Sequence, residues 1–217
     1  LHLLSRRQRQ MCIRDRIICV FNLMRKGGEL MLLGDPFAVS VMVKSVKEWN
    51  DYGDHYEPLN GGIMIITVDG FMFPFNEVLN VSLNCAIPEL INNLKGIPYN
   101  EDIFKLEDKK SAFKEIYDLV YYNHIHDEND GIEEDWRYKV SPTEFLDHDF
   151  LIFAVSNGTK VRFLASKVEY IKSLSLHNLD DIAVREVFVT HAEIDHIING
   201  LEDWLKYYLS HPIVYKS

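Results

Sequence analysis

Apolar and polar positions alternate along several short stretches of this chain, with the two-residue period of β-strands. Valines at alternate positions within residues 38–46 predict a strand with at least one buried face. Residues 63–68 are apolar almost throughout and predict a buried strand, which Asp69-Gly70 turns into residues 71–73. The pattern therefore predicts a sheet that starts beyond Pro36 and continues as a hairpin.

A second hairpin gives the clearest signal in the sequence. Residues 150–156 and 159–165 flank Asn157-Gly158, a pair that suits a tight two-residue turn because glycine tolerates a positive φ. In the second arm, apolar residues alternate with Lys160 and Arg162. This alternation predicts a strand with one solvated face.

Apolar residues at helical spacing follow the first hairpin. Residues 83–94 predict a helix with Pro88 near its first turn and Gly96 as its stop. Residues 111–122 predict a second helix, because their apolar positions repeat every three or four residues.

The C-terminal part of the chain predicts a strand over residues 184–190 and then a long helix. Thr190 and Glu193 are spaced as a capping box at the start of this helix. Its predicted buried stripe consists of Ile194, Ile197, Ile198, Leu201, Leu205 and Tyr208. Together these elements predict an α+β fold, in which helices pack against an antiparallel sheet built from hairpins.

Residues 1–30 show neither the two-residue period of a strand nor the spacing of an amphipathic helix, and they are rich in arginine. Residues 8–16 resemble translated sequencing-adapter sequence, and residues 25–30 can be encoded by a purine-rich run that resembles a bacterial ribosome-binding site before the Met31 codon. We interpret residues 1–30 as an unstructured, non-native leader and residues 31–217 as a single domain. A signal peptide is the alternative, but its apolar stretch would be short and would lack a small-residue cleavage site.

The domain is strongly acidic. The full chain has 23 basic and 33 acidic residues, of which residues 1–30 hold seven and two, so residues 31–217 have 16 and 31. Such a charge disfavours binding to nucleic-acid phosphates and suits a protein partner with a basic surface. Cys85 is the single cysteine of residues 31–217, and no apolar run reaches the roughly 20 residues of a membrane span. We therefore expect a cytoplasmic protein that binds neither nucleic acid nor a membrane.

One pair of histidines has the spacing of metal ligands. His124 and His126 would place both rings on one side of an extended segment, with Asp127 beside them. The spacing supplies no complete ligand set, so we expect no metal and no other cofactor. A metal-dependent hydrolase that uses this pair is the alternative function.

The other candidate residues point to structural roles. His191 and His196 lie five residues apart, which turns their rings away from each other on a helix. Cys85 begins an apolar helix without a nearby activating base, so we expect it in the core. Because no catalytic constellation is present in the sequence pattern, we expect a protein that is not an enzyme.

The strongest resemblance begins at Met31-Leu32-Leu33-Gly34-Asp35-Pro36-Phe37 and includes Glu48-Trp49-Asn50. Together with residues 62–73, 83–94 and 185–205 in the same order, these motifs resemble the immunity protein 42 family. Members of that family are encoded beside secreted polymorphic toxins in bacteria. The motif residues are Gly34, Asp35, Pro36, Phe37 and Trp49.

The resemblance implies a non-enzymatic antitoxin that binds a cognate toxin and blocks its active site or substrate groove. The acidic residues 123–135 have no counterpart in the family pattern. We hypothesise that their carboxylates face a basic toxin cleft and that an aromatic neighbour is the buried anchor. The proposed contact residues are Tyr122, Asp127, Glu128, Asp130, Glu133, Glu134, Asp135 and Trp136. A regulatory domain whose partner is not a toxin is a further alternative.

Overall fold

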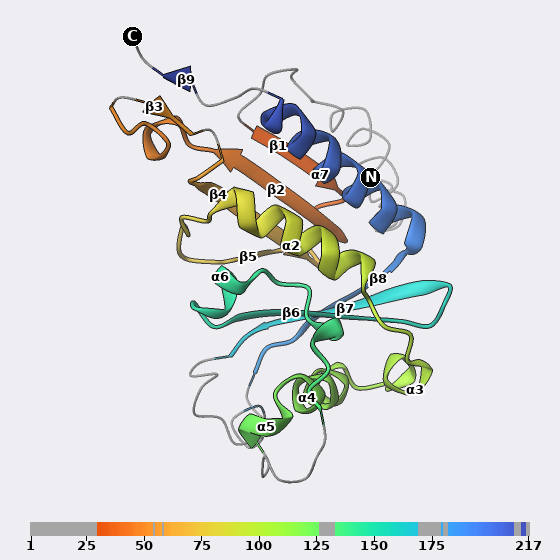
Figure 1. Ribbon diagram of the computed structural model, residues 1–217. Coiled ribbons are helices and arrows are strands. Elements are labelled where there is room, and N and C mark those ends of the chain that lie inside the picture. The colour runs from red at the N-terminus through yellow and green to blue at the C-terminus, as the bar shows by residue number, and fades with distance from the viewer. Residues whose placement is uncertain are drawn as a thin grey trace, which may run out of the picture.

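The computed structural model describes residues 30–53, 55–57, 59–125, 133–168, 179, 182–210 and 214–215. Two antiparallel sheets form its framework (Figure 1). The first sheet has the strand order β1 (Leu30–Gly34), β2 (Val39–Ser45), β4 (Gly62–Val68) and β5 (Phe71–Phe73). The second has the order β6 (Phe150–Ser156), β7 (Lys160–Lys167) and β8 (Arg185–Thr190). A short pair joins β3 (His55–Tyr56) to β9 (Val214–Tyr215). This arrangement confirms the predicted α+β class.

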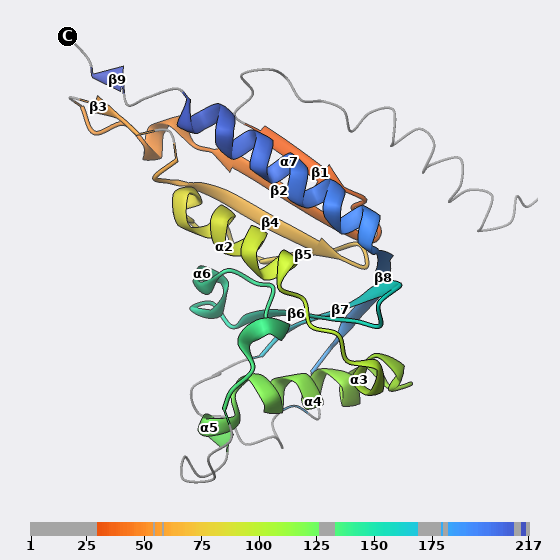
Figure 2. The same ribbon diagram turned by 45° about the vertical axis from the view of Figure 1, so that its right-hand side comes forward.

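Helices cover both sheets. The two longest are α2 (Leu83–Lys95) and α7 (His191–Leu209), and α4 (Lys109–Val120) lies at the far side of the second sheet (Figures 1 and 2). The short helices are α3 (Glu101–Lys105), α5 (Tyr122–Ile125) and α6 (Thr143–Leu146), with 3-10 turns η1 (Lys47–Trp49) and η3 (Trp136–Tyr138). No helix among the described residues is long and apolar enough to cross a lipid bilayer.

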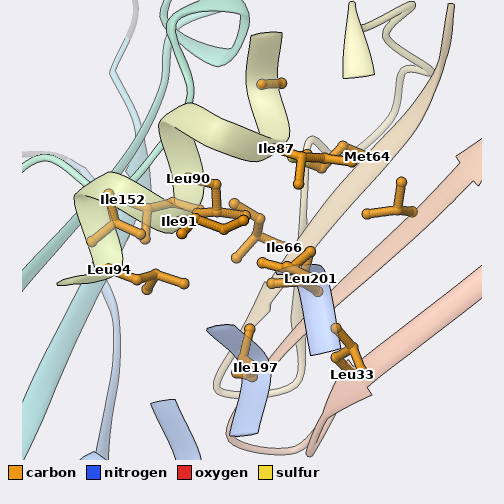
Figure 3. Packing of buried hydrophobic residues seen from close by; sticks show 14 of the residues in the cluster. Leu33, Met64, Ile66, Ile87, Leu90, Ile91, Leu94, Ile152, Ile197 and Leu201 are labelled. Atoms are coloured by element: carbon orange, nitrogen blue, oxygen red, sulfur yellow. The ribbon is translucent and has the colours of Figure 1, made fainter. Parts of the chain in front are cut away.

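The first core lies between the two sheets. It joins the inner face of the first sheet, helices α2 and α7, and one face of the second sheet. Figure 3 shows Ile87 of α2 beside Met64 of β4. Helix α7 approaches β1 closely at Gly200, where an added Cβ would overlap the Leu33 side chain.

The second core lies between the second sheet and α4. Strand β6 is buried on both faces, so its alternate side chains enter different cores. Phe153 packs against Phe113 of α4, with their ring centroids 4.9 Å apart. Asp108 caps the start of α4, and its carboxylate accepts hydrogen bonds from the backbone N–H groups of Lys110 and Ser111.

The second core corrects one prediction. Arg162 of β7 is 1% exposed, so the predicted solvated face of this strand is wrong. Its Nε donates to Glu186 Oε1 at 2.7 Å, and its Nη1 donates to the carbonyls of Ile103, Phe104 and Leu106 at 3.1, 3.0 and 2.8 Å. The charge is buried because it caps the carbonyl end of α3, a contact between segments far apart in the sequence.

Local signals placed the Asp69-Gly70 turn and the last helix correctly. The second turn is shifted by one residue from the prediction, because Ser156 pairs with Val161 and the Asn157 N–H donates to the carbonyl of Lys160 at 3.1 Å, which leaves Gly158 and Thr159 at the tip. Both predicted hairpins form, with φ of +53° at Asp69 and +74° at Gly70. Thr190 Oγ1 accepts from the Glu193 backbone N–H, and the Glu193 carboxylate accepts from the Thr190 N–H, which confirms the capping box. Helix α7 buries the predicted stripe, although Leu205 is only partly buried.

Three features of the fold differ from the predictions. Strand β1 lies before Pro36, where no strand was expected, and β2 is therefore the second strand. Pro88 lies in the second turn of α2. Cys85 is exposed, so the expectation that it lies in the core is wrong. The inward positions of α2 are Leu83, Ala86, Ile87, Leu90, Ile91 and Leu94, and the helical period turns residue 85 away from them.

Four of the motif residues form the turn between β1 and β2. Gly34 has φ of +87°, and the Asp35 N–H donates to the carbonyl of Val39 at 3.0 Å. The Asp35 carboxylate accepts the N–H of Phe37 at 2.9 Å, which closes the turn around Pro36. An added Cβ at Gly34 would overlap the Val39 carbonyl oxygen, so this turn requires glycine. The fifth motif residue, Trp49, lies in η1 and is 39% exposed.

Candidate partner-binding surface

A short segment after the acidic stretch lies along α4. The backbone N–H of Asp135 donates to the carbonyl of Leu119 at 2.9 Å, near the end of that helix. Trp136 then packs edge-on against Tyr121, with ring centroids 5.2 Å apart and an interplanar angle of 79°. These contacts hold residues 133–138 against the outer side of the second core.

Trp136 stands at the end of a column of aromatic rings. Tyr121 contacts Tyr117 with centroids 4.7 Å apart, and Tyr117 contacts Phe153 of β6 with centroids 6.5 Å apart. Burial raises the pKa of Tyr121 well above its usual value, and the nearby charge of Glu134 adds to this shift. Trp136 itself is 42% exposed. A large aromatic side chain is thus presented to solvent on a rigid support.

Carboxylates precede Trp136 in the segment and are also present on the polar side of α4. Glu133 and Glu115 are exposed, and Glu134 and Asp118 are half-buried. Burial raises the pKa of Tyr138, and the charges of Asp135 and Glu115 add to the shift, so Glu115 of α4 lies close to the segment. We call the residues Glu115, Asp118, Glu133, Glu134 and Trp136 the Trp136 surface.

The basic side chains near this surface are engaged within the chain. Arg137 donates to the Asp135 carboxylate through Nε at 2.8 Å and Nη2 at 2.7 Å. Lys139 is 8% exposed, and its Nζ lies 3.3 Å from the Glu89 carboxylate and 5.6 Å from the centroid of the Trp136 ring. The positive charges of Arg137 and Lys139 are therefore each offset by a carboxylate of the chain.

Asp135 shapes the segment. Its carboxylate accepts the Arg137 backbone N–H at 3.1 Å as well as the two guanidinium bonds, and it begins the turn η3. Hydrogen bonds from the Arg137 side chain hold the pKa of Asp135 below its usual value. The Asp135 carboxylate is thus engaged in hydrogen bonds with Arg137 of the same chain.

Replacing Asp135 by asparagine is expected to lower the free energy of unfolding by about 1 kcal/mol or less, because the pair is close to solvent. The folded-state pKa lies below the unfolded one, so the contribution is present above the unfolded pKa and is lost as pH falls through the folded value. Urea unfolding of both proteins over a pH series measures the difference. An Arg137→Gln variant should show the same dependence of stability on pH as Asp135→Asn. A stability difference between the parent protein and Asp135→Asn that persists at acidic pH contradicts this account.

The predicted contact residues fall into two groups. Glu133, Glu134, Asp135 and Trp136 are described, and Tyr122 begins α5 at the end of α4. Asp127, Glu128 and Asp130 lie outside the described residues, so their part in the hypothesis stays a prediction. Glu115 and Asp118 were missed by sequence reasoning. They occupy the polar side of α4, a signal that marks an exposed face without showing what lies beside it.

Among the described residues, the candidate metal and catalytic side chains form no assembled site. His126 lies outside the described residues, as does the His124 side chain, and the described residues contain no group of three potential metal ligands. His191 and His196 are both exposed on α7, and His191 Nε2 lies 2.9 Å from Ser156 Oγ. That hydroxyl also accepts the N–H of Gly158, and Ser156 is 4% exposed, so the contact ties the β6–β7 turn to the start of α7.

Comparison with known proteins decides the family. A family model described as immunity protein 42 matches residues 31–204. The chain belongs to the immunity protein 42 family. It is accordingly an immunity protein, which neutralises a cognate toxin. The motif turn at Gly34 and the packing of α7 on β1 both lie within the matched region.

A solved structure shares the fold of this immunity protein. The crystal structure of CdiI from Burkholderia dolosa AUO158 aligns with a TM-score of 0.58 and 14% sequence identity. The alignment covers 81% of this chain and 99% of the CdiI chain. No curated protein sequence is similar enough to count as a match.

Proposed function

We propose that this immunity protein neutralises its toxin in the cytoplasm by stoichiometric binding without catalysis, and that the Trp136 surface contacts a basic region of the toxin. One observation carries the proposal. Trp136 is substantially exposed on a column of buried rings and follows the carboxylates of Glu133 and Glu134, while Arg137 and Lys139 are paired with carboxylates of the chain.

The energetics of protein interfaces support this choice. Tryptophan is enriched among residues that dominate binding, because a large ring buries much area with few rotatable bonds. The ring of Trp136 is already ordered against Tyr121, so little side-chain entropy would be lost on binding. Carboxylates around such an anchor favour a basic partner, speed its encounter and disfavour acidic surfaces.

Trp136→Ala tests the anchor. We expect the Kd for the cognate toxin to rise by about thirtyfold or more, as for a central hot-spot residue. The measurement is calorimetric titration of purified toxin with the full chain. Trp49→Ala is the matched control, because Trp49 is 39% exposed but lies in η1, away from the Trp136 surface. Equal affinities of the two variants would refute the anchor.

Charge reversal tests the acidic part of the same surface. Glu115→Lys with Glu133→Lys should slow association strongly and reduce its dependence on salt. Glu48→Lys with Asp195→Lys makes the same change in net charge at exposed positions elsewhere, so it separates a local from a global effect. Titration of toxin activity should also end at one equivalent of immunity protein. Turnover of excess toxin would overturn the non-enzymatic proposal.

A further inference from the structure

Glu89 of α2 connects the first core to the part of the chain that follows Trp136. Its Oε1 accepts from Lys139 Nζ at 3.3 Å and from Thr143 Oγ1 at 2.9 Å, and its Oε2 accepts the backbone N–H of Thr143 at 3.0 Å. Lys139 and Thr143 lie 50 and 54 positions further along the chain. Both carboxylate oxygens of Glu89 are therefore engaged on the side of α2 that faces α6 (Figures 1 and 2).

The sequence at the start of α6 explains two of these hydrogen bonds. Pro142 precedes the helix, and its side chain has no oxygen that could accept the first backbone N–H groups. The carboxylate of Glu89, which belongs to a different helix, accepts the N–H of Thr143. Helix α6 consequently fixes the Glu89 carboxylate in the place where it meets Lys139.

The Lys139 ammonium is shared by the Glu89 carboxylate and the Trp136 ring. The side chain of Lys139 is buried, and its Nζ lies over the ring, 5.6 Å from the ring centroid. This distance is within the range of a cation–π contact. The backbone N–H of Lys139 also donates to the Trp136 carbonyl at 3.1 Å. The exposed ring thus rests on a cation that Glu89 holds, while Tyr121 packs edge-on against it.

We propose that Glu89 is a positioning residue for the Trp136 surface. Its carboxylate holds the Lys139 ammonium against the ring, and this contact keeps the ring in the orientation that it presents to solvent. Glu89 therefore acts on the partner through Lys139 and Trp136, without touching the partner itself. Its effect on toxin affinity rests on the proposed function, whereas its effect on the ring does not.

The indole N–H signal of Trp136 in NMR spectra of the full chain tests the positioning without toxin. The signal is assigned by its absence in Trp136→Phe. We expect Glu89→Gln to shift it, because glutamine has one acceptor oxygen and no negative charge. The Lys139 ammonium is then no longer held against the ring. Circular dichroism of each variant verifies that the fold is intact.

Glu202→Gln is the matched control for Glu89→Gln. Glu202 of α7 pairs with Lys95 of α2 at 2.6 Å, and its side chain is 31% exposed, against 28% for Glu89. The control therefore removes an ion pair of α2 that involves α7 in place of Lys139, and it should leave the Trp136 signal unchanged. A Trp136 signal that stays in place in Glu89→Gln, or that moves equally in Glu202→Gln, overturns the proposal.

Toxin affinity tests the consequence for the partner. In calorimetric titration with purified cognate toxin, we expect Glu89→Gln to raise the Kd about three- to tenfold, as for residues coupled in one network. Glu202→Gln should leave the Kd unchanged. Adding Lys139→Met to Glu89→Gln should restore most of the affinity, because methionine retains the volume and its sulfur packs favourably on an aromatic ring.

A double-mutant cycle shows whether Glu89 acts through Trp136. Glu89→Gln should have no further effect on the Kd in the Trp136→Ala background. A full effect in that background, or no recovery with Lys139→Met, overturns the positioning role in toxin binding. If Trp136→Ala itself leaves the affinity unchanged, the proposed function and this effect on toxin binding fall together, while the Trp136 signal still decides whether Glu89 positions the ring.

Discussion

Replacing Arg162 by alanine is expected to lower the free energy of unfolding by about 3–5 kcal/mol, because it leaves buried partners without their cation. Glu186 would lose its ion pair, and the carbonyls of Ile103, Phe104 and Leu106 would lose their donor. Arg162 also lies over Phe188, with its guanidinium carbon 5.5 Å from the ring centroid. Urea unfolding measured by circular dichroism gives the change.

Two companion variants separate charge from packing at Arg162. Arg162→Lys keeps the charge, but a single ammonium cannot reproduce the planar set of donors, so we expect an intermediate loss of stability. Arg162→Met with Glu186→Gln removes both charges while retaining volume, and should be more stable than Arg162→Ala. If Arg162→Ala and this double variant lose the same stability, the buried charge is not the source of the effect.

Replacing Gly34 by alanine is expected to cost about 3 kcal/mol. The residue has φ of +87°, which strains an L side chain by about 1–2 kcal/mol. In addition, the new Cβ would overlap the Val39 carbonyl oxygen and press on Ile197 of α7, and such overpacking costs about 1–3 kcal/mol.

Gly53→Ala is the control for Gly34→Ala. Gly53 has a nearly identical φ of +88°, but an added Cβ there meets no atom within 4 Å. It should therefore show only the backbone strain, about 1–2 kcal/mol. Thermal unfolding of both variants compares them directly. Equal losses would show that the close approach of Val39 to Gly34 contributes nothing.

The parts of the fold that follow from neighbouring residues could be predicted from the sequence. Asp69-Gly70 and Gly158 specify their turns by their own φ preferences, and the Thr190 capping box acts within one helical turn. Strand β1 was missed because Leu30 to Leu33 form a continuous apolar run, and because Leu30 was assigned to the N-terminal segment that we interpreted as unstructured. Such a run carries no strand period of its own.

Long-range contacts limited the rest of the prediction. Arg162 appears solvated by alternation, and only the approach of α3 shows that it is buried. For the candidate surface, the composition identified the described residues Glu133, Glu134 and Trp136. The composition gave no indication that Arg137 donates hydrogen bonds to the Asp135 carboxylate, or that the charge of Glu115 in α4 acts on Tyr138. These facts depend on tertiary contacts that no local pattern contains.

Strand β6 couples the two ends of the molecule thermodynamically. Because its alternate side chains complete both cores, neither core can open without exposing half of this strand. We therefore expect the protein to unfold in a single cooperative transition. An interaction that stabilises one core would then also stabilise the other core against unfolding. A toxin bound beside α4 would then slow hydrogen exchange in β1 and β2, on the far side of the molecule. Binding of the toxin would therefore also stabilise the first sheet of this immunity protein against local opening.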